Sequence, residues 1–174
     1  MQVEFNHTQV NAYRLIGYEN RVLRNEDFKN DAKDAGDMGS GHTCTALYEI
    51  VPVGVEIPLQ KAGELKYQKG TDTPAAKSGE WLTVRMRYKL PDSEQGMELA
   101  TEMPASGLAK RPSEDFQFAA SVAAFGMLLR DSGYKGEATF EKVHEWANQA
   151  IANDRNGRRA EFVKLVGNAQ RLKR

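Results

Sequence analysis

The sequence contains a single cysteine, Cys44, among its 174 residues. One thiol cannot form an internal disulfide, and it cannot supply a four-cysteine zinc site. The chain also lacks net charge, because 24 Lys and Arg residues balance 24 Asp and Glu residues. Without a basic or an acidic excess, neither a strongly basic nucleic-acid binder nor an acidic solvating tail is indicated, so we expect no nucleic acid as partner.

Long apolar runs are missing as well. No stretch approaches the roughly 18 apolar residues that a membrane span needs, so we expect no direct insertion into a membrane. The first residues, MQVEFN, show neither a basic start nor an apolar segment, and no signal peptide is visible. We therefore expect either a cytosolic chain or a piece of a longer protein whose targeting segment lies upstream. The content of 40% hydrophobic and 28% charged residues is typical of a folded domain.

Five stretches in the first part of the chain are predicted to be strands, because they are rich in β-branched and aromatic residues between turn residues. They are 3–5, 11–18, 42–53, 81–90 and 97–103. The last two flank a turn at 91–96 and should form an antiparallel hairpin.

The stretch 81–90, with the sequence WLTVRMRYKL, alternates apolar and polar residues with a period of two. Such alternation is typical of a strand that buries one face and exposes the other. We therefore expect the side chains of Val84, Met86 and Tyr88 to be buried. Arg85 and Arg87 should face water.

After residue 112 the apolar residues recur with the period of an α-helix. Three predicted helices begin at side chains that can accept a hydrogen bond from the first turn, namely Ser113, Thr139 and Asp154. We expect Gly133 to end the first helix in the left-handed conformation. The apolar face of that helix should pack on the sheet through Phe118, Val122, Phe125 and Leu129.

Strands followed by helices predict an α+β fold with segregated elements. We expect an antiparallel β-sheet or sandwich of about five strands, followed by a C-terminal segment of three helices. The length is that of a single domain, so we predict one unit over 1–174, mainly β over 1–105 and mainly α over 113–174.

Ser40, His42 and Cys44 are the first candidates for chemistry, since nucleophilic catalysis requires a nucleophile beside a base. Ser40 and His42 precede a predicted strand, whereas a nucleophile elbow lies between a strand and a helix. We interpret this segment as a flexible entry to the strand. His42 and Cys44 can share a strand face, but zinc would need two more ligands, so a small buried cysteine is expected.

An acidic, glycine-rich loop over 27–41 is the second candidate, with Asp27, Asp31, Asp34 and Asp37. Calcium prefers several oxygens from one loop, but the alternate-residue spacing of an EF-hand is absent. We predict a solvated loop and keep ion binding as the alternative, because the glycines let the backbone curl around an ion. Those glycines (Gly36, Gly39 and Gly41) precede a strand, so they present no helix N-terminus to a phosphate.

The predicted last helix is basic and is the third candidate. Its cations are Arg155, Arg158, Arg159, Lys164, Arg171, Lys173 and Arg174. We expect a solvated helical face, because no aromatic residues are interleaved with these cations. Binding of nucleic acid or of an acidic partner is the alternative. No residue is assigned to a catalytic, cofactor or metal site.

Several ordered stretches together resemble one protein family. They are 12–21 (AYRLIGYENR), Asp34-Ala35-Gly36 with Gly39-x-Gly41-His42, 45–50 (TALYEI) and 116–129 (FQFAASVAAFGMLL). The pattern is similar to the C-terminal region of bacterial von Willebrand factor type A domain proteins, a region of unknown function. The resemblance spans nearly the whole chain.

This resemblance implies a non-enzymatic accessory domain that supports protein binding or scaffolding. In the family, a von Willebrand factor type A domain lies upstream and carries a metal-ion-dependent adhesion site of the form Asp-x-Ser-x-Ser. That pattern is absent here, so no metal ligands carry over. The implied partners are the upstream domain and a further protein, in a bacterial cell-envelope or cell-surface setting.

Two rival hypotheses and one consequence follow from the same residues. The first rival is a cell-envelope hydrolase that uses His42 with Asp34 or Asp37. The second is a nucleic-acid binder that uses the basic C-terminal helix. If a neighbouring domain normally packs here, the strand at 3–5 is left with an open edge, and weak self-association is expected through it.

Overall fold

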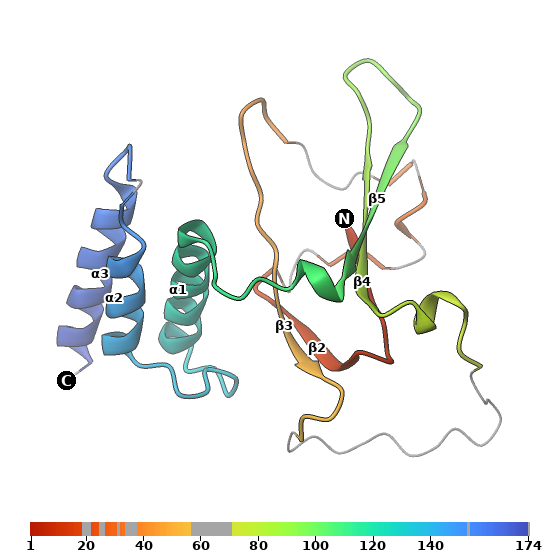
Figure 1. The fold of residues 1–174 in the computed structure, drawn as a ribbon. Coiled ribbons are helices and arrows are strands. Elements are labelled where there is room, and N and C mark those ends of the chain that lie inside the picture. Colours follow the sequence, from red (N-terminus) through yellow and green to blue (C-terminus); the bar gives the residue numbers. More distant parts are fainter. Residues whose placement is uncertain are drawn as a thin grey trace. The chain divides into compact units, whose positions relative to one another are not determined.

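The computed structural model of the protein describes residues 1–18, 22–24, 27–30, 32–33, 38–56, 71–152 and 154–173. Over these residues the chain has an α+β fold with five strands in two small antiparallel sheets and three α-helices (Figure 1). It forms two compact units. Met1–Cys44 and Tyr48–Leu108 make up a sheet unit, and Thr45–Leu47 with Ala109–Arg174 make up a helical unit.

The predicted order of elements is confirmed, with strands before residue 105 and α-helices after residue 113. That the whole chain folds as one domain stays a prediction. None of the helices in the described residues combines the length and the apolar character that crossing a bilayer requires.

The strands confirm four of the five predicted stretches closely. They are β1 (Gln2–Phe5), β2 (Val10–Ile16), β3 (Leu47–Pro52), β4 (Glu80–Tyr88) and β5 (Met97–Pro104). In the three-stranded sheet β4 lies between β1 and β5, and in the two-stranded sheet β2 pairs with β3. The predicted strand over 42–53 is too long, since 42–46 lie outside any strand. A β-prone segment needs a neighbouring strand for its backbone hydrogen bonds. The partner strand β2 has only seven residues, which is too few to pair with all of 42–53.

The register of the three-stranded sheet separates an apolar face from a polar face. Val84 pairs with Val3, and Met86 pairs with Leu99, so these residues share the apolar face. On the other face the Arg85 guanidinium donates to the Glu4 carboxylate at 2.8 Å. The period-two pattern of β4 therefore predicted correctly which residues share a face.

Among the described residues, aromatic rings cover one end of the apolar face. There the Phe5 ring stacks on Tyr13 of β2 with ring centroids 4.1 Å apart and meets Tyr48 of β3 edge-on at 5.4 Å. Burial raises the pKa of the Tyr48 hydroxyl, and the nearby Tyr13 adds to the rise. The small β2–β3 sheet thus shields the Phe5 end of the face.

The other end of the apolar face is open to solvent, and we call it the Met86 patch. It consists of Met86, Met97 and Leu99, whose exposed fractions are 44%, 44% and 52%. The prediction that Met86 is buried is therefore wrong, and Val84 and Tyr88 are only half-buried. Arg85 and Arg87 are also half-buried instead of exposed. Alternation identifies a face, but burial requires a second layer, and the ring contacts of the two-stranded sheet in the described residues lie at the Phe5 end.

The helices are α1 (Glu114–Leu129), α2 (Phe140–Gln149) and α3 (Arg158–Leu172). Ser113 caps α1 by accepting the Phe116 amide at 3.1 Å, and Thr139 caps α2 in the same way. The Asp154 carboxylate accepts the Ala160 amide at 2.9 Å. The predicted capping side chains are thus confirmed, although the N-cap position of α3 is Gly157, in the left-handed conformation.

The end of α1 differs from the prediction in one residue. Asp131, with φ of 52°, takes the left-handed position that was expected for Gly133. The Ser132 amide donates to the Met127 carbonyl at 2.9 Å and the Asp131 amide to the Leu128 carbonyl at 3.3 Å, which is a Schellman motif. Aspartate tolerates this conformation because its short polar side chain finds local partners, here the Lys135 ammonium.

The core of the helical unit is formed by contacts among its own helices. Phe162 of α3 meets Phe118 and Phe125 of α1, with centroids 5.3 and 5.4 Å apart. Val143, Ala147, Ala150 and Val166 are fully buried. The recorded ring partners of Phe118 and Phe125 thus belong to helices, and packing of this face on the sheet stays a prediction. Val122 and Leu129, at 42% and 54% exposed, are not buried.

The capping carboxylate of Asp154 links the stability of α3 to pH. Its hydrogen bond with the Ala160 amide is the main reason that its pKa lies below the ordinary value. A lowered folded-state pKa contributes stability that is present above the unfolded value, about 4, and is lost as pH falls through the folded value. We expect melting curves to show the wild type above the Asp154→Asn variant at neutral pH. The gap should close in acid, and a gap that does not change with pH would contradict this role.

Candidate functional site

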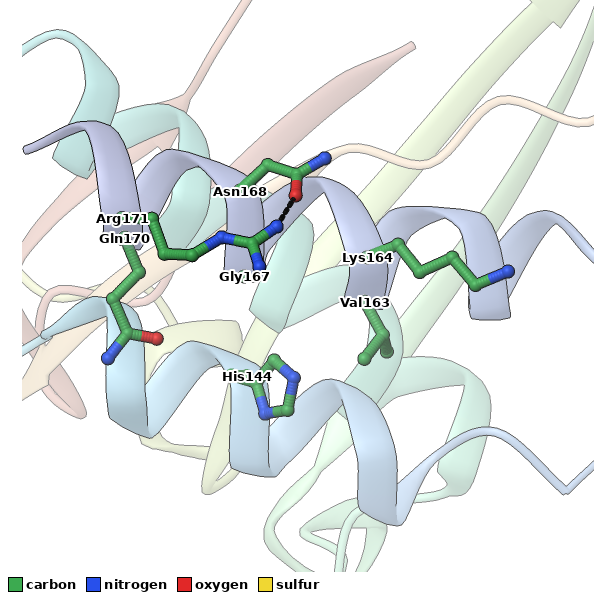
Figure 2. Close-up of a pocket in the computed structure, with 7 residues that line it drawn as sticks. All are labelled: His144, Val163, Lys164, Gly167, Asn168, Gln170 and Arg171. Atoms are coloured by element: carbon green, nitrogen blue, oxygen red, sulfur yellow. Dashed lines mark hydrogen bonds between the residues drawn. The ribbon is translucent and has the colours of Figure 1, made fainter.

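A groove of about 400 Å³ lies between α2 and α3 (Figure 2). Helix α2 contributes a single lining side chain, His144. Helix α3 contributes Val163, Lys164, Gly167, Asn168, Gln170 and Arg171. Most of these side chains carry hydrogen-bond donors, and two are cations, so the groove suits a ligand with negatively charged oxygens.

The helical period places the donors of α3 on one face. Lys164, Asn168 and Arg171 stand at positions i, i+4 and i+7, which stack along one side of a helix. Gly167 leaves the floor of the groove open beside the His144 ring. A Cβ atom built on Gly167 would lie 3.9 Å from Cδ2 of His144. The ring therefore lies close to the backbone of α3.

Hydrogen bonds hold two of the lining side chains. The Gln170 amide donates to the Glu141 carboxylate at 2.7 Å and so joins α3 to α2. The Arg171 guanidinium donates to the side-chain oxygen of Asn168. In Figure 2, Arg171 reaches over the groove from one end, and Lys164 extends away from the other end. The groove thus has a mixed polar and apolar lining, with a cationic residue of α3 near each end.

Two further cations, Arg159 of α3 and Lys173 at its C-cap, have a different role. The Arg159 guanidinium donates to the Ala150 carbonyl at 2.7 Å, pairs with Asp115 and lies 4.9 Å from the centroid of the Phe118 ring. The Lys173 ammonium donates to the Leu128 carbonyl at 3.2 Å. These two residues fasten α3 to its neighbours, and the expectation of one solvated basic face is wrong for Arg159, which is half-buried, whereas Lys173 is exposed. Arg174 lies outside the described residues.

The residues that sequence reasoning weighed for nucleophilic or zinc chemistry lie elsewhere. His42 is exposed in a turn, where its amide donates to the Gly39 carbonyl at 3.1 Å. Cys44 is exposed, so the expectation of a buried cysteine is wrong, and its thiol lies 3.3 Å from the Tyr18 hydroxyl. The segment around Cys44 is not part of the strand that was expected to bury it.

The acidic loop falls largely outside the described residues. Asp27 is described, but Asp31, Asp34, Gly36 and Asp37 are not. Ion binding within 27–41 and the hydrolase hypothesis, which uses Asp34 or Asp37, therefore stay predictions. In the part of the chain that the structure does describe, no three His, Cys, Asp or Glu residues gather closely enough to hold a metal ion.

Sequence reasoning did not identify the groove as a site. A signal was present in α3, where Lys164, Asn168 and Arg171 repeat at helical spacing around a glycine that interrupts a helical segment. The contribution of His144 could not be read in the same way, because it depends on how α2 lies against α3. No local pattern records that packing.

Comparisons with known proteins identify a family. The family model described as "Uncharacterized protein YfbK, C-terminal" matches residues 1–172. A curated relative, "Uncharacterized protein YfbK" of Escherichia coli (strain K12), is 41% identical over 171 residues. The match covers 95% of this chain but only 28% of that relative. No solved structure matches the chain.

Proposed function

Because this chain belongs to the YfbK C-terminal family, we propose that it is a non-enzymatic accessory domain that binds protein. The matched segment makes up only 28% of the curated relative, which is therefore much longer. In such a protein the nearest candidate partner is the rest of the same polypeptide. We propose that this neighbour is a von Willebrand factor type A domain, as the family resemblance of the sequence implies.

The Met86 patch is the observation that carries this proposal. Its three residues lie on one sheet face, with Met86 paired directly to Leu99 across the β4–β5 hairpin. Each exposes more than two fifths of its surface. Unbranched, polarizable methionine side chains adapt to different contact surfaces. An apolar sheet face that is covered at only one end is suited to a second protein layer.

The resemblance also supports a bacterial cell-envelope or cell-surface setting for the full-length protein. Fractionation of cells that produce the full-length protein tests this setting. Recovery of the protein in the cytosolic fraction alone would contradict it.

Leu99 provides the sharpest test of the proposed interface. We expect this chain to bind the remaining part of the E. coli relative when the two are mixed, and sedimentation velocity to show a heavier complex. Leu99→Gln should weaken that binding by about tenfold, because it places an amide in an apolar contact. The matched control is Ala100→Gln, which adds the same amide on the opposite face of β5, where Ala100 is exposed.

Sedimentation velocity of this chain alone, over a series of concentrations, separates this interface from self-association. Weak association of the chain with itself, through β1 or the Met86 patch, would appear without the added part. A strict monomer that ignores the added part would contradict the accessory role. Equal weakening by Leu99→Gln and Ala100→Gln would contradict the Met86 patch as the interface.

A further inference from the structure

We propose that the groove between α2 and α3 binds an acidic peptide segment of a partner protein, with Lys164 and Arg171 each pairing with one carboxylate. The inference goes beyond the proposed function, because it concerns the helical unit and does not need the Met86 patch. It rests on four properties of the groove, namely its charge, the spacing of its cations, its neutral donors and its position along α3.

The charge of the groove is one-sided. Its lining includes two cations and no acidic side chain. The nearby carboxylate of Glu141 accepts a hydrogen bond from the Gln170 side-chain amide at 2.7 Å. That carboxylate is therefore already engaged by a neutral donor. Lys164 is exposed, and no hydrogen bond or ion pair occupies its ammonium in the described structure.

The spacing of the two cations selects a ligand with two acidic groups. Lys164 and Arg171 stand seven positions apart on α3, which corresponds to about 10 Å along a helix axis. Carboxylates two turns apart on a helix have the same separation, and an extended segment reaches it in about three residues.

Neutral donors lie between the two cations. The His144 ring carries an N–H on either nitrogen, and the Asn168 amide can donate two hydrogen bonds. One N–H group of the Arg171 guanidinium donates to the side-chain oxygen of Asn168, and this bond orients the remaining N–H groups of the guanidinium. A peptide that lies along the groove would therefore find partners for its backbone carbonyls as well as for its carboxylates.

The position of the groove along α3 favours a peptide over a phosphate or a nucleic acid as the ligand. Phosphate sites usually surround the ion with backbone amides at a helix N-terminus, whereas these residues lie within α3, where the amides bond to the helix itself. Affinity for nucleic acid grows with the number of phosphates that are neutralised. Arg159 and Lys173, which would extend the basic surface, are instead bonded to the Ala150 and Leu128 carbonyls.

The test uses a fluorescein-labelled, alanine-rich peptide with two glutamates separated by two helical turns, and its glutamine counterpart as the control. We expect the glutamate peptide to raise the anisotropy signal at low salt, and the glutamine peptide to bind at least about tenfold more weakly. Lys164→Gln and Arg171→Gln should each weaken glutamate-peptide binding by about three- to tenfold. Arg158→Gln, an exposed position of α3 outside the groove lining, should leave it unchanged.

Each remaining outcome contradicts the proposal in a different way. No binding, or equal weakening by Arg158→Gln, would remove the groove as the site. Stronger binding of inorganic phosphate or of a labelled oligonucleotide would overturn the assignment to an acidic peptide. Leu99→Gln should leave glutamate-peptide binding intact, so failure of this proposal and failure of the proposed sheet interface can be told apart.

Discussion

Replacing Phe125 by alanine is expected to cost the helical unit about 3–5 kcal/mol of unfolding free energy. Phe125 is only 6% exposed, and its ring contacts Phe140 of α2 and Phe162 of α3. Truncation would remove both edge-to-face contacts and leave a cavity where the three helices meet. Because surrounding side chains relax only partly, the cavity adds to the lost burial. Urea unfolding followed by far-ultraviolet circular dichroism measures the loss in the helices.

The same helix supplies a matched control. Phe116 also belongs to α1 but is 55% exposed. Phe116→Ala removes the same atoms from a solvent-facing site and should change the unfolding free energy by about 0.5 kcal/mol or less. Equal losses for the two variants would show that burial in the three-helix core is not what distinguishes Phe125.

Replacing Val143 by aspartate should unfold the helical unit altogether. Val143 is fully buried in α2. An aspartate there must either carry an unpaired charge in an apolar core or stay protonated with a raised pKa, and both options are costly. The expected loss of several kcal/mol is comparable with the whole stability of a typical domain, about 5–15 kcal/mol. The helical circular dichroism signal should therefore be lost, or the melting temperature should fall sharply.

A second aspartate variant separates burial from charge. Val122→Asp introduces the same side chain in α1, at a position that is 42% exposed. The new carboxylate can stay hydrated there, so the unit should remain folded and lose only a little stability. Retained native melting in Val143→Asp would mean that α2 does not bury this position in solution.

Burial is distributed unevenly between the two units. Among the described residues, the fully or nearly fully buried apolar side chains belong to the helical unit, except for Val10 in β2. The helical unit therefore contains its own core, which both stability predictions address. The sheet unit relies on the Phe5, Tyr13 and Tyr48 rings and leaves the Met86 patch open. This difference is the reason that we propose the Met86 patch as the contact surface for a neighbouring domain.

Features that depend on neighbours in the sequence were predicted well. The β4–β5 hairpin follows from two β-prone runs around a turn, and Ser113 and Thr139 cap helices where their side chains can reach the first-turn amides. The prediction that Gly133 takes the left-handed position at the end of α1, where the structure has Asp131, is a local error. Both residue types occur in the left-handed conformation, so composition alone could not decide between them.

The sequence by itself therefore determined the α+β class, the order of the elements, the caps and the residues that share a face of β4. Only the tertiary structure decided that Met86 is exposed, that Phe125 packs on Phe140 and Phe162, and that His144 lines one groove together with residues of α3. The physical reason is the range of the interactions. Periodicity and capping act within a few residues, whereas burial and groove lining depend on which distant elements come together.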